Sequence, residues 1–201
     1  MPVRRRLSRE QRREQIIDVT LRSIAENGVR GTTLSRIAAD VGVTTPALYA
    51  HFANRKEILL AALDMLFEHR TLPHRNPTMD SAIDRLREIG HRHTQLLASQ
   101  DDRSVFALFE FIAAPPEEGL RETLGQKHLL LVNDIAEIVR EGQTDGTIRR
   151  DVDAAQTAWM IMSRAWTEDI THLMGVDEWD AQRSNQMLEL ILDSIAVVPQ
   201  P

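Results

Sequence analysis

The chain has 201 residues, 42% of them hydrophobic and 27% charged, as in an ordinary folded globular protein and unlike a disordered or low-complexity chain. It has no cysteine, which excludes disulfides, thiolate metal sites and cysteine nucleophiles. No run approaches the roughly 20 apolar residues that a membrane helix needs, so we expect a cytoplasmic protein with no membrane partner.

The formal charge of −6 conceals a split along the chain. Residues 1–60 hold 11 Lys and Arg against 6 Asp and Glu, whereas residues 61–201 hold 13 against 24. A basic segment on an acidic body favours an anionic partner for that segment, because contacts from Arg and Lys to phosphates supply most non-specific affinity for nucleic acids. A solvated charged face or a flexible basic tail would account for the same charge.

The first helical pattern lies near the N-terminus. Its apolar side recurs at a spacing of three and four residues, at Ile16, Ile17, Thr20, Leu21 and Ile24. Ser8 and Gln11 form a capping-box pair ahead of this pattern, and Asn27-Gly28 supplies a left-handed stop after it. The sequence therefore predicts a helix over residues 9–26.

Two short helices are predicted next. The first carries apolar residues at helical spacing, is opened by Thr32 or Thr33, and is closed at Gly42. The second has Thr44 as its cap and tolerates Pro46 in its first turn, where a missing N–H costs nothing. This arrangement matches the helix-turn-helix unit, whose second helix enters the major groove of DNA.

The second short helix presents two different faces. Leu48 and Phe52, four residues apart, are predicted to pack inward. The outward positions are small or hydrogen-bonding, namely Thr45, Pro46, Ala47, Tyr49, Ala50 and His51. Small and hydrogen-bonding side chains are suited to contacts with phosphates and base edges.

The remainder of the chain is also predicted to be helical. Asn54 and Glu57 form a capping-box-like pair ahead of a long apolar pattern, and a proline-rich break over 71–78 marks a linker. Further helical segments are predicted over residues 80–99, 102–113, 116–141, 153–174 and 177–197. No window alternates with the period of a β-strand. We therefore expect an all-α protein of about nine helices, divided into domains over 9–69 and 78–201.

Three sequence blocks lie in and around the predicted helix-turn-helix unit. They are Gly31-Thr-Thr-Leu-Ser-Arg-Ile-Ala-Ala-Asp-Val-Gly-Val43, Leu48-Tyr-Ala-His-Phe52 and Asn54-Arg-Lys-Glu57. With them, residues 9–67 resemble the DNA-binding domain of the tetracycline-repressor (TetR) family. The rest of the chain agrees with this family in length, helicity and the turn over 145–153. The resemblance implies a three-helix DNA-binding domain followed by a helical domain for effector binding and dimerisation.

The resemblance also implies three groups of DNA-binding residues. Thr33, Ser35 and Arg36 would touch the backbone and sometimes a base. Base readout would come from Thr44, Thr45, Pro46 and Ala47. Phosphates would be bound by Tyr49, His51 and Lys56. Tyr49 and His51 could instead cover the domain core, and the basic tail over 4–6 could follow a groove or remain inert.

For the C-terminal half, the resemblance implies a homodimer formed by the helices over 153–174 and 177–197. Their apolar stripes comprise Ala158, Ile161, Met162 and Ala165 on one helix and Met187, Leu190, Ile191, Ser194 and Ile195 on the other. Each stripe could equally face the core of its own subunit. The candidate effector-binding residues are Phe106, Phe109, Glu110, Trp159, Met162 and Trp166, although aromatic residues at helical spacing are also common in cores.

Neither a metal nor a cofactor is expected. His91 and His93 are two residues apart, which places them on different sides of a helix, and His69 and His74 flank the linker. We expect these histidines to be exposed. The chain has no nucleophile elbow, phosphate-binding glycine loop or paired-carboxylate motif, which argues against an enzyme.

The resulting hypothesis is a ligand-responsive transcriptional regulator, most simply a repressor. It would bind a pseudo-palindromic double-stranded DNA operator as a homodimer, and a small-molecule effector would release it. The alternative is an all-α enzyme or a helical interaction protein without specific DNA binding. That alternative predicts no affinity for DNA and a dispensable N-terminal domain.

Overall fold

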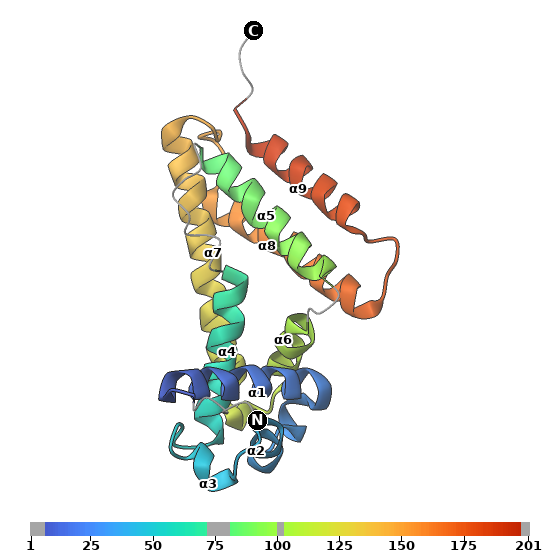
Figure 1. Cartoon of the computed structure of the whole chain (residues 1–201). Helices are drawn as coiled ribbons and strands as arrows, with labels where there is room; N and C mark the ends of the chain where they lie inside the picture. The colour runs from blue at the N-terminus through green and yellow to red at the C-terminus, as the bar shows by residue number, and fades with distance from the viewer. Residues whose placement is uncertain (1–6, 72–80, 100–102, 198–201) are drawn as a thin grey trace. The chain divides into compact units, whose positions relative to one another are not determined.

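The computed structural model describes residues 7–71, 81–99 and 103–197. These residues form nine α-helices and no strand, which confirms the predicted all-α class (Figure 1). The helices are α1 (Arg9–Gly31), α2 (Leu34–Val41), α3 (Thr45–Leu48), α4 (Arg55–Thr71), α5 (Ala82–Ala98), α6 (Ser104–Ala113), α7 (Leu120–Asp145), α8 (Ala154–Met174) and α9 (Ala181–Ile195). Across the described ranges, no helix combines the length and apolar character needed to cross a membrane.

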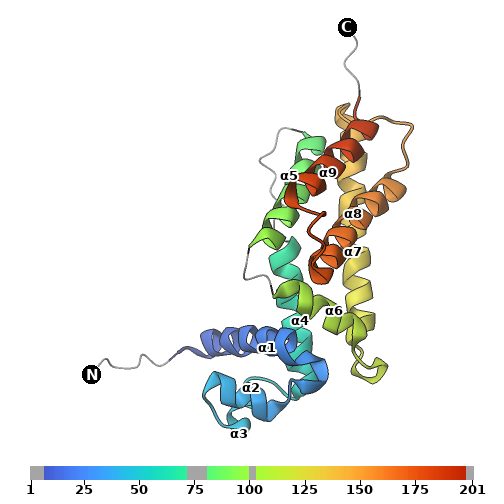
Figure 2. The same ribbon diagram turned by 90° about the vertical axis from the view of Figure 1, so that its right-hand side faces the viewer.

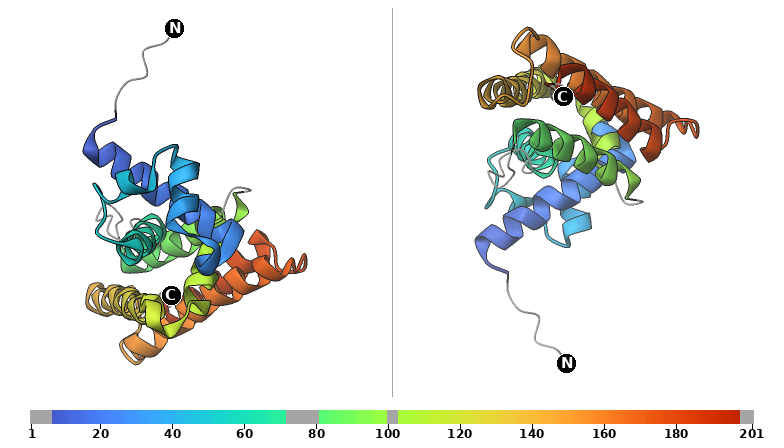
Figure 3. Two further views of the ribbon diagram at one scale, coloured as in Figure 1. Left: turned by 90° about the horizontal axis from the view of Figure 1, so that it is seen from below. Right: turned by 90° about the horizontal axis from the view of Figure 1, so that it is seen from above.

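The chain divides into two compact units. Among the described residues, the first unit holds 7–69 and 103–125, and the second holds 70–71, 81–99 and 126–197. In the first unit α6 packs on α1, and α2 packs on both α1 and α3 (Figure 3, left). In the second, α5, α8 and α9 pack against one another (Figure 2).

The N-terminal helix begins as predicted and ends later. Ser8 and Gln11 form the predicted capping box. At Gly28, with φ 70° and ψ 168°, the backbone leaves the helix, but one further turn continues to Gly31. The predicted interruption at Gly28 is confirmed, and the single turn that follows it is the part of α1 that was not predicted. The continuation is stabilised because the carboxylate of Glu110 accepts a hydrogen bond from the N–H of Val29, at 3.1 Å.

The helix-turn-helix unit forms from the expected residues with one local difference. The Thr33 hydroxyl caps α2 by accepting from the N–H of Arg36, and Gly42 ends α2 in the left-handed region. Thr44 occupies the predicted N-cap position of α3, although its side chain makes no capping hydrogen bond. Leu48 is buried, as predicted, and anchors this single-turn helix.

The start of α4 follows the predicted capping pair with a shift of one residue. The N–H of Glu57 donates to the side-chain oxygen of Asn54 at 2.9 Å. The Glu57 carboxylate accepts from the N–H of Ala53 at 2.6 Å, and not from Asn54 as in a regular capping box. The backbone N–H groups of Ala53 and Glu57 are thus both satisfied by side chains.

The largest differences from the predicted boundaries in the C-terminal half are in α7 and α9. The helix predicted over 116–141 spans Leu120–Asp145, because Pro116–Glu118 forms a 3-10 turn that Gly119 ends with φ 68°. The last helix begins at Ala181, where the predicted start was 177, because the Asp180 side chain caps the N–H of Arg183.

Candidate nucleic-acid interface

The segment from Thr44 to His51 is held by buried apolar side chains on one face and is exposed to solvent on the other. Leu48 and Phe52 are buried in the first unit, as the sequence predicts. Thr44, Pro46, Ala47 and Ala50 are exposed, Thr45 is partly buried, and Tyr49 has 54% of its surface exposed. The segment therefore presents hydroxyl, methyl and phenol groups outward from a fixed apolar base.

The candidate residues of α2 are exposed, and two of them have local partners. The Thr33 hydroxyl accepts the capping bond, and the Arg36 guanidinium donates to the side chain of Asn27 at 2.9 Å. Ser35 is exposed. The present partner of Arg36 is the neutral amide of Asn27, which binds a guanidinium more weakly than a carboxylate does. A phosphate can therefore displace it.

His51 lies at the end of the segment and is partly buried. Its ring Nδ1 is buried and has no hydrogen-bond partner, while its backbone oxygen accepts from Arg13 at 2.7 Å. Burial of the ring and the neighbouring charges of Arg9, Arg12 and Arg13 lower the pKa of His51 below its ordinary value of 6.5. The imidazole is therefore neutral at pH 7.

Lys56 stands at the start of α4 and is exposed. It makes no ion pair with another described residue. Its ammonium lies close to Gly119, where any side chain would place its Cβ 3.0 Å from Nζ. A cation without a carboxylate partner near a helix start is free to meet a phosphate.

Two arginines that the sequence analysis did not single out hold this region together. Arg13 donates to the backbone of His51 and stacks over the ring of Phe52 at 4.0 Å, and it also pairs with Glu57 at 3.4 Å. Arg55 donates to the backbone oxygens of Thr32 and Val29 and pairs with Glu118 at 2.7 Å.

The arginine contacts link residues that are far apart in sequence. Arg13 lies 38 residues from His51, and Arg55 lies 63 from Glu118. A sequence pattern carries no signal for such pairs, since an arginine on a helix is most often solvated. The only local hint was the position of Arg55 directly after the Asn54 cap.

The predicted effector residues belong to different units. In the first unit, Phe106 is exposed and Phe109 and Glu110 are partly buried, with the Glu110 carboxylate bound to the backbone of Val29. In the second unit, Trp159 and Trp166 both contact the ring of His128, at centroid distances of 5.5 and 5.4 Å. Met162 in that unit is buried. Their role in ligand binding stays a prediction.

The expectation of exposed histidines was wrong for His93. Its side chain is only 16% exposed, and its Nε2 lies 3.2 Å from Asp169 and 3.8 Å from Glu168. His91 faces Glu189 at 3.6 Å. Over the described ranges, no group of three potential metal ligands occurs. The side chain of His69, all of His74 and the tail over 4–6 lie outside the described residues.

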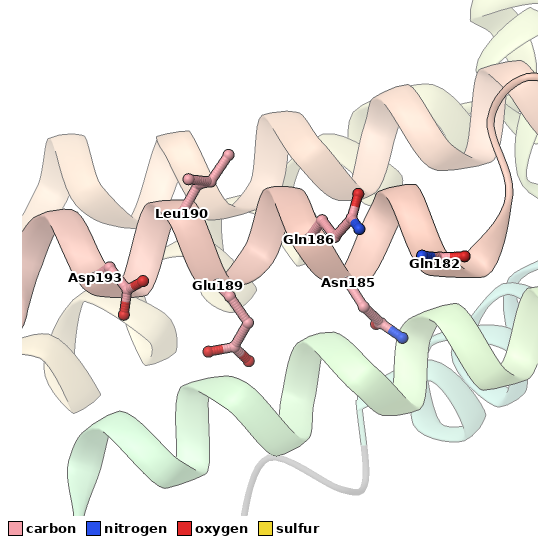
Figure 4. A pocket seen from close by; sticks show the side chains of 6 residues that line it. All are labelled: Gln182, Asn185, Gln186, Glu189, Leu190 and Asp193. Atoms are coloured by element: carbon pink, nitrogen blue, oxygen red, sulfur yellow. The ribbon is translucent and has the colours of Figure 1, made fainter.

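The predicted apolar stripes of α8 and α9 divide between core and surface. Ala158, Ile161 and Met162 on α8 are buried in the second unit, as are Ile191 and Ile195 on α9. Leu190, in contrast, is 67% exposed and Met187 is also exposed. A pocket along α9 is lined by Gln182, Asn185, Gln186, Glu189, Leu190 and Asp193; Asn185 and Glu189 point toward α5, and Leu190 points away from it (Figure 4).

Comparisons with known proteins agree with this geometry. The profile of a family described as bacterial regulatory proteins, tetR family, matches residues 16–62, which include the whole helix-turn-helix unit. The fatty acid metabolism regulator protein of Bacillus subtilis is 26% identical, over 90% of this chain and 94% of that protein. The HTH-type transcriptional repressor KstR2 of Mycolicibacterium smegmatis is 25% identical, over 92% and 90%.

Solved structures show the same architecture. A protein from Rhodococcus sp. assigned to the TetR family has a TM-score of 0.77 and 26% identity, and the match covers 92% of this chain and 98% of that one. FadR from Bacillus subtilis in complex with stearoyl-CoA has a TM-score of 0.71 and 24% identity, covering 90% and 98%. The fold and its exposed recognition segment define a helix-turn-helix DNA-binding regulator. Residues 16–62 match the DNA-binding domain of the TetR family, and the chain as a whole is similar to transcriptional regulators of that family.

Proposed function

We propose that this regulator is a repressor that binds a pseudo-palindromic operator as a homodimer, with one helix-turn-helix unit in each half-site. The observation that carries the proposal is the exposed segment Thr44–His51, anchored by Leu48 and Phe52 and bordered by cationic groups. Thr44, Thr45, Pro46 and Ala47 would read bases. Phosphate contacts would come from Tyr49, His51 and Lys56, with Thr33, Ser35 and Arg36 beside them.

The homodimer would form through the exposed parts of α8 and α9. Leu190, Met187 and Ile170 are large apolar side chains with substantial exposure, although neighbouring residues of the same helices are buried. Exposed apolar side chains on adjacent helices favour burial against another protein surface. In a two-fold symmetric dimer, that surface is the same patch on a second copy of the chain. A dimer also supplies the two recognition segments that an inverted repeat requires.

The effector would be a small molecule with a substantial apolar part. Its candidate contacts are Phe106, Phe109, Glu110, Trp159, Met162 and Trp166, which combine aromatic and thioether groups with one carboxylate. Binding would favour a conformation with lower affinity for the operator, and thus shift the population away from the DNA-bound form. The proposal requires no catalytic activity, metal or cofactor.

The experiment is a selection of genomic DNA from the source organism by the purified full-length protein. Fragments retained at moderate salt are sequenced, and the selection is repeated with Pro46→Gly, which alters the proposed base-reading surface. The proposal predicts enrichment of a short inverted repeat by the wild-type chain and a changed or weakened motif for the variant. Retention without any enriched sequence would contradict specific regulation and favour a helical interaction protein.

A further inference from the structure

The start of α1 carries a net positive charge where a helix does not favour it. Arg9, Arg12 and Arg13 lie in its first turns together with Glu10 and Glu14, which leaves a net charge of +1. Exposed N–H groups give a helix N-terminus a partial positive charge, so cations are disfavoured there. A sequence that departs from a local rule in this way often does so at a functional site, where a partner of opposite charge compensates.

Arg9 connects this charge to the recognition segment. Its Nη2 donates to the backbone oxygen of Ala50 at 3.3 Å, across 41 residues of sequence. Ala50 stands between Tyr49 and His51, two of the proposed phosphate contacts. The Arg9 guanidinium is therefore next to the end of α3, and the single bond to Ala50 leaves its other N–H donors available.

The three arginines differ in how their charges are compensated. Arg13 pairs with Glu57, and Arg12 donates to the neutral side chain of Gln15 at 2.8 Å. Arg9 is exposed and makes no ion pair with a carboxylate in the part of the chain that the structure describes. The positive potential of all three extends to His51, whose pKa is lowered first by burial and then by these charges.

We propose that Arg9 binds a DNA phosphate next to the contacts of Tyr49 and His51, which extends the backbone-binding surface from α3 onto the first turn of α1. The inference rests on the proposed function. A guanidinium matches two phosphate oxygens with parallel N–H groups, and the Ala50 bond orients it before DNA arrives. The contact positions the protein on the duplex and carries no sequence information.

The rival interpretation is purely structural, with Arg9 serving only to hold the end of α3 through Ala50. Two substitutions separate these roles. Arg9→Gln removes the charge and leaves a shorter side chain with an amide donor, whereas Arg9→Lys keeps the charge on a side chain of nearly the original length. The matched control is Arg22→Gln, which removes one positive charge from the same helix at a residue paired with Asp18 at 3.0 Å.

The test is the salt dependence of DNA binding by the full-length protein. The probe is a labelled random-sequence duplex of about 30 base pairs, which accommodates two half-sites one helical turn apart. Affinity is measured by fluorescence anisotropy between about 50 and about 200 mM salt. Each lost phosphate contact lowers the slope of log affinity against log salt by about 0.9, hence by about 1.8 for two subunits.

The inference predicts a slope reduced by about 1.8 for Arg9→Gln, a slope close to wild type for Arg9→Lys, and an unchanged slope for Arg22→Gln. The inference is overturned if Arg9→Gln keeps the wild-type slope. It is also overturned if Arg9→Gln and Arg9→Lys lose the same affinity and both lose thermal stability, because Arg9 would then act only as a structural residue. A wild-type chain that bound no duplex at any salt would overturn the proposed function itself, and the inference with it.

Discussion

The carboxylate of Glu110 on α6 accepts a hydrogen bond from the backbone N–H of Val29 on α1, at 3.1 Å. This N–H follows Gly28, where the helix is interrupted, so it lacks its usual partner one turn earlier. The contact therefore joins α6 to α1, the helix on which α2 of the helix-turn-helix unit packs. Within the first unit, Glu110 is the side chain that stabilises the break in α1.

Removal of this acceptor should destabilise the first unit. Glu110→Ala leaves the Val29 N–H without a partner, and we expect a loss of about 1–3 kcal/mol in the free energy of unfolding. Glu110→Gln keeps an acceptor oxygen and should cost less. Urea unfolding followed by circular dichroism measures both variants, and equal stabilities for Glu110→Ala and wild type would show that the hydrogen bond is unimportant.

A second prediction concerns the buried ionic cluster of the second unit. Arg164 is buried, its Nη2 lies 3.3 Å from Glu168, and its Nη1 donates to Ser184 at 2.6 Å. Its pKa is lowered by burial, against the opposing effect of Glu168 and Asp169. Arg164→Met leaves both carboxylates without their buried cation, and we expect destabilisation of about 3–5 kcal/mol.

The double variant Arg164→Met with Glu168→Gln is the control for this cluster. It removes one of the uncompensated charges, so part of the stability should return. Thermal unfolding of the single and double variants is the measurement. An Arg164→Met protein as stable as wild type would mean that solvent reaches the cluster and that the charges are not effectively buried.

The pH dependence of stability should reflect His51 and His128. Burial lowers the pKa of both below 6.5, and the charges of Arg9, Arg12 and Arg13 lower that of His51 further. The unfolded chain therefore binds more protons than the native one just below pH 6.5, so stability rises with pH there. Both contributions are fully present above pH 6.5 and are lost as the pH falls toward the native pKa values.

The measurement is the urea midpoint of the DNA-free protein across this pH range. His51→Gln and His128→Gln should each flatten the decline below pH 6.5, and the double variant should flatten it most. If stability instead increased as the pH fell below 6.5, the native imidazoles would be protonated more readily than in the unfolded chain, contrary to their environments.

The proposed DNA contacts separate into two kinds with different signatures. Tyr49→Ala and Lys56→Ala should weaken binding by similar factors for all sequences and reduce its salt dependence, because phosphate contacts are independent of sequence. Thr45→Val should change the preferred sequence and leave the salt slope intact. Binding of a random-sequence duplex and of the selected inverted repeat provides the comparison, and an unaltered slope for Lys56→Ala would refute its assignment.

Features fixed by neighbouring residues could be predicted from sequence. The Ser8–Gln11 capping box and the left-handed Gly42 depend on contacts within a few residues, and the inward positions of Leu48 and Phe52 follow from their spacing of four residues. Their signals lie in short patterns, and the structure confirms them. The position of the helix-turn-helix unit therefore follows from the sequence alone.

Features that depend on distant partners could not be predicted in the same way. The extra turn of α1 is held by Glu110, 81 residues away, and His93 lies against a carboxylate of α8, a helix that packs on α5. Arg13 and Arg55 also act through distant backbone oxygens. Tertiary contacts of this kind leave no local periodicity, so single-residue roles at the site are harder to infer than the elements that carry it.

The most direct test of the account is hydrogen–deuterium exchange of the full chain, with and without the duplex recovered from the genomic selection. The account predicts slower exchange on DNA binding in peptides that cover 33–56 and the first turn of α1, and little change at the buried centre of α5. Unchanged exchange over 33–56, with protection confined to other segments, would contradict the claim that this helix-turn-helix unit binds DNA.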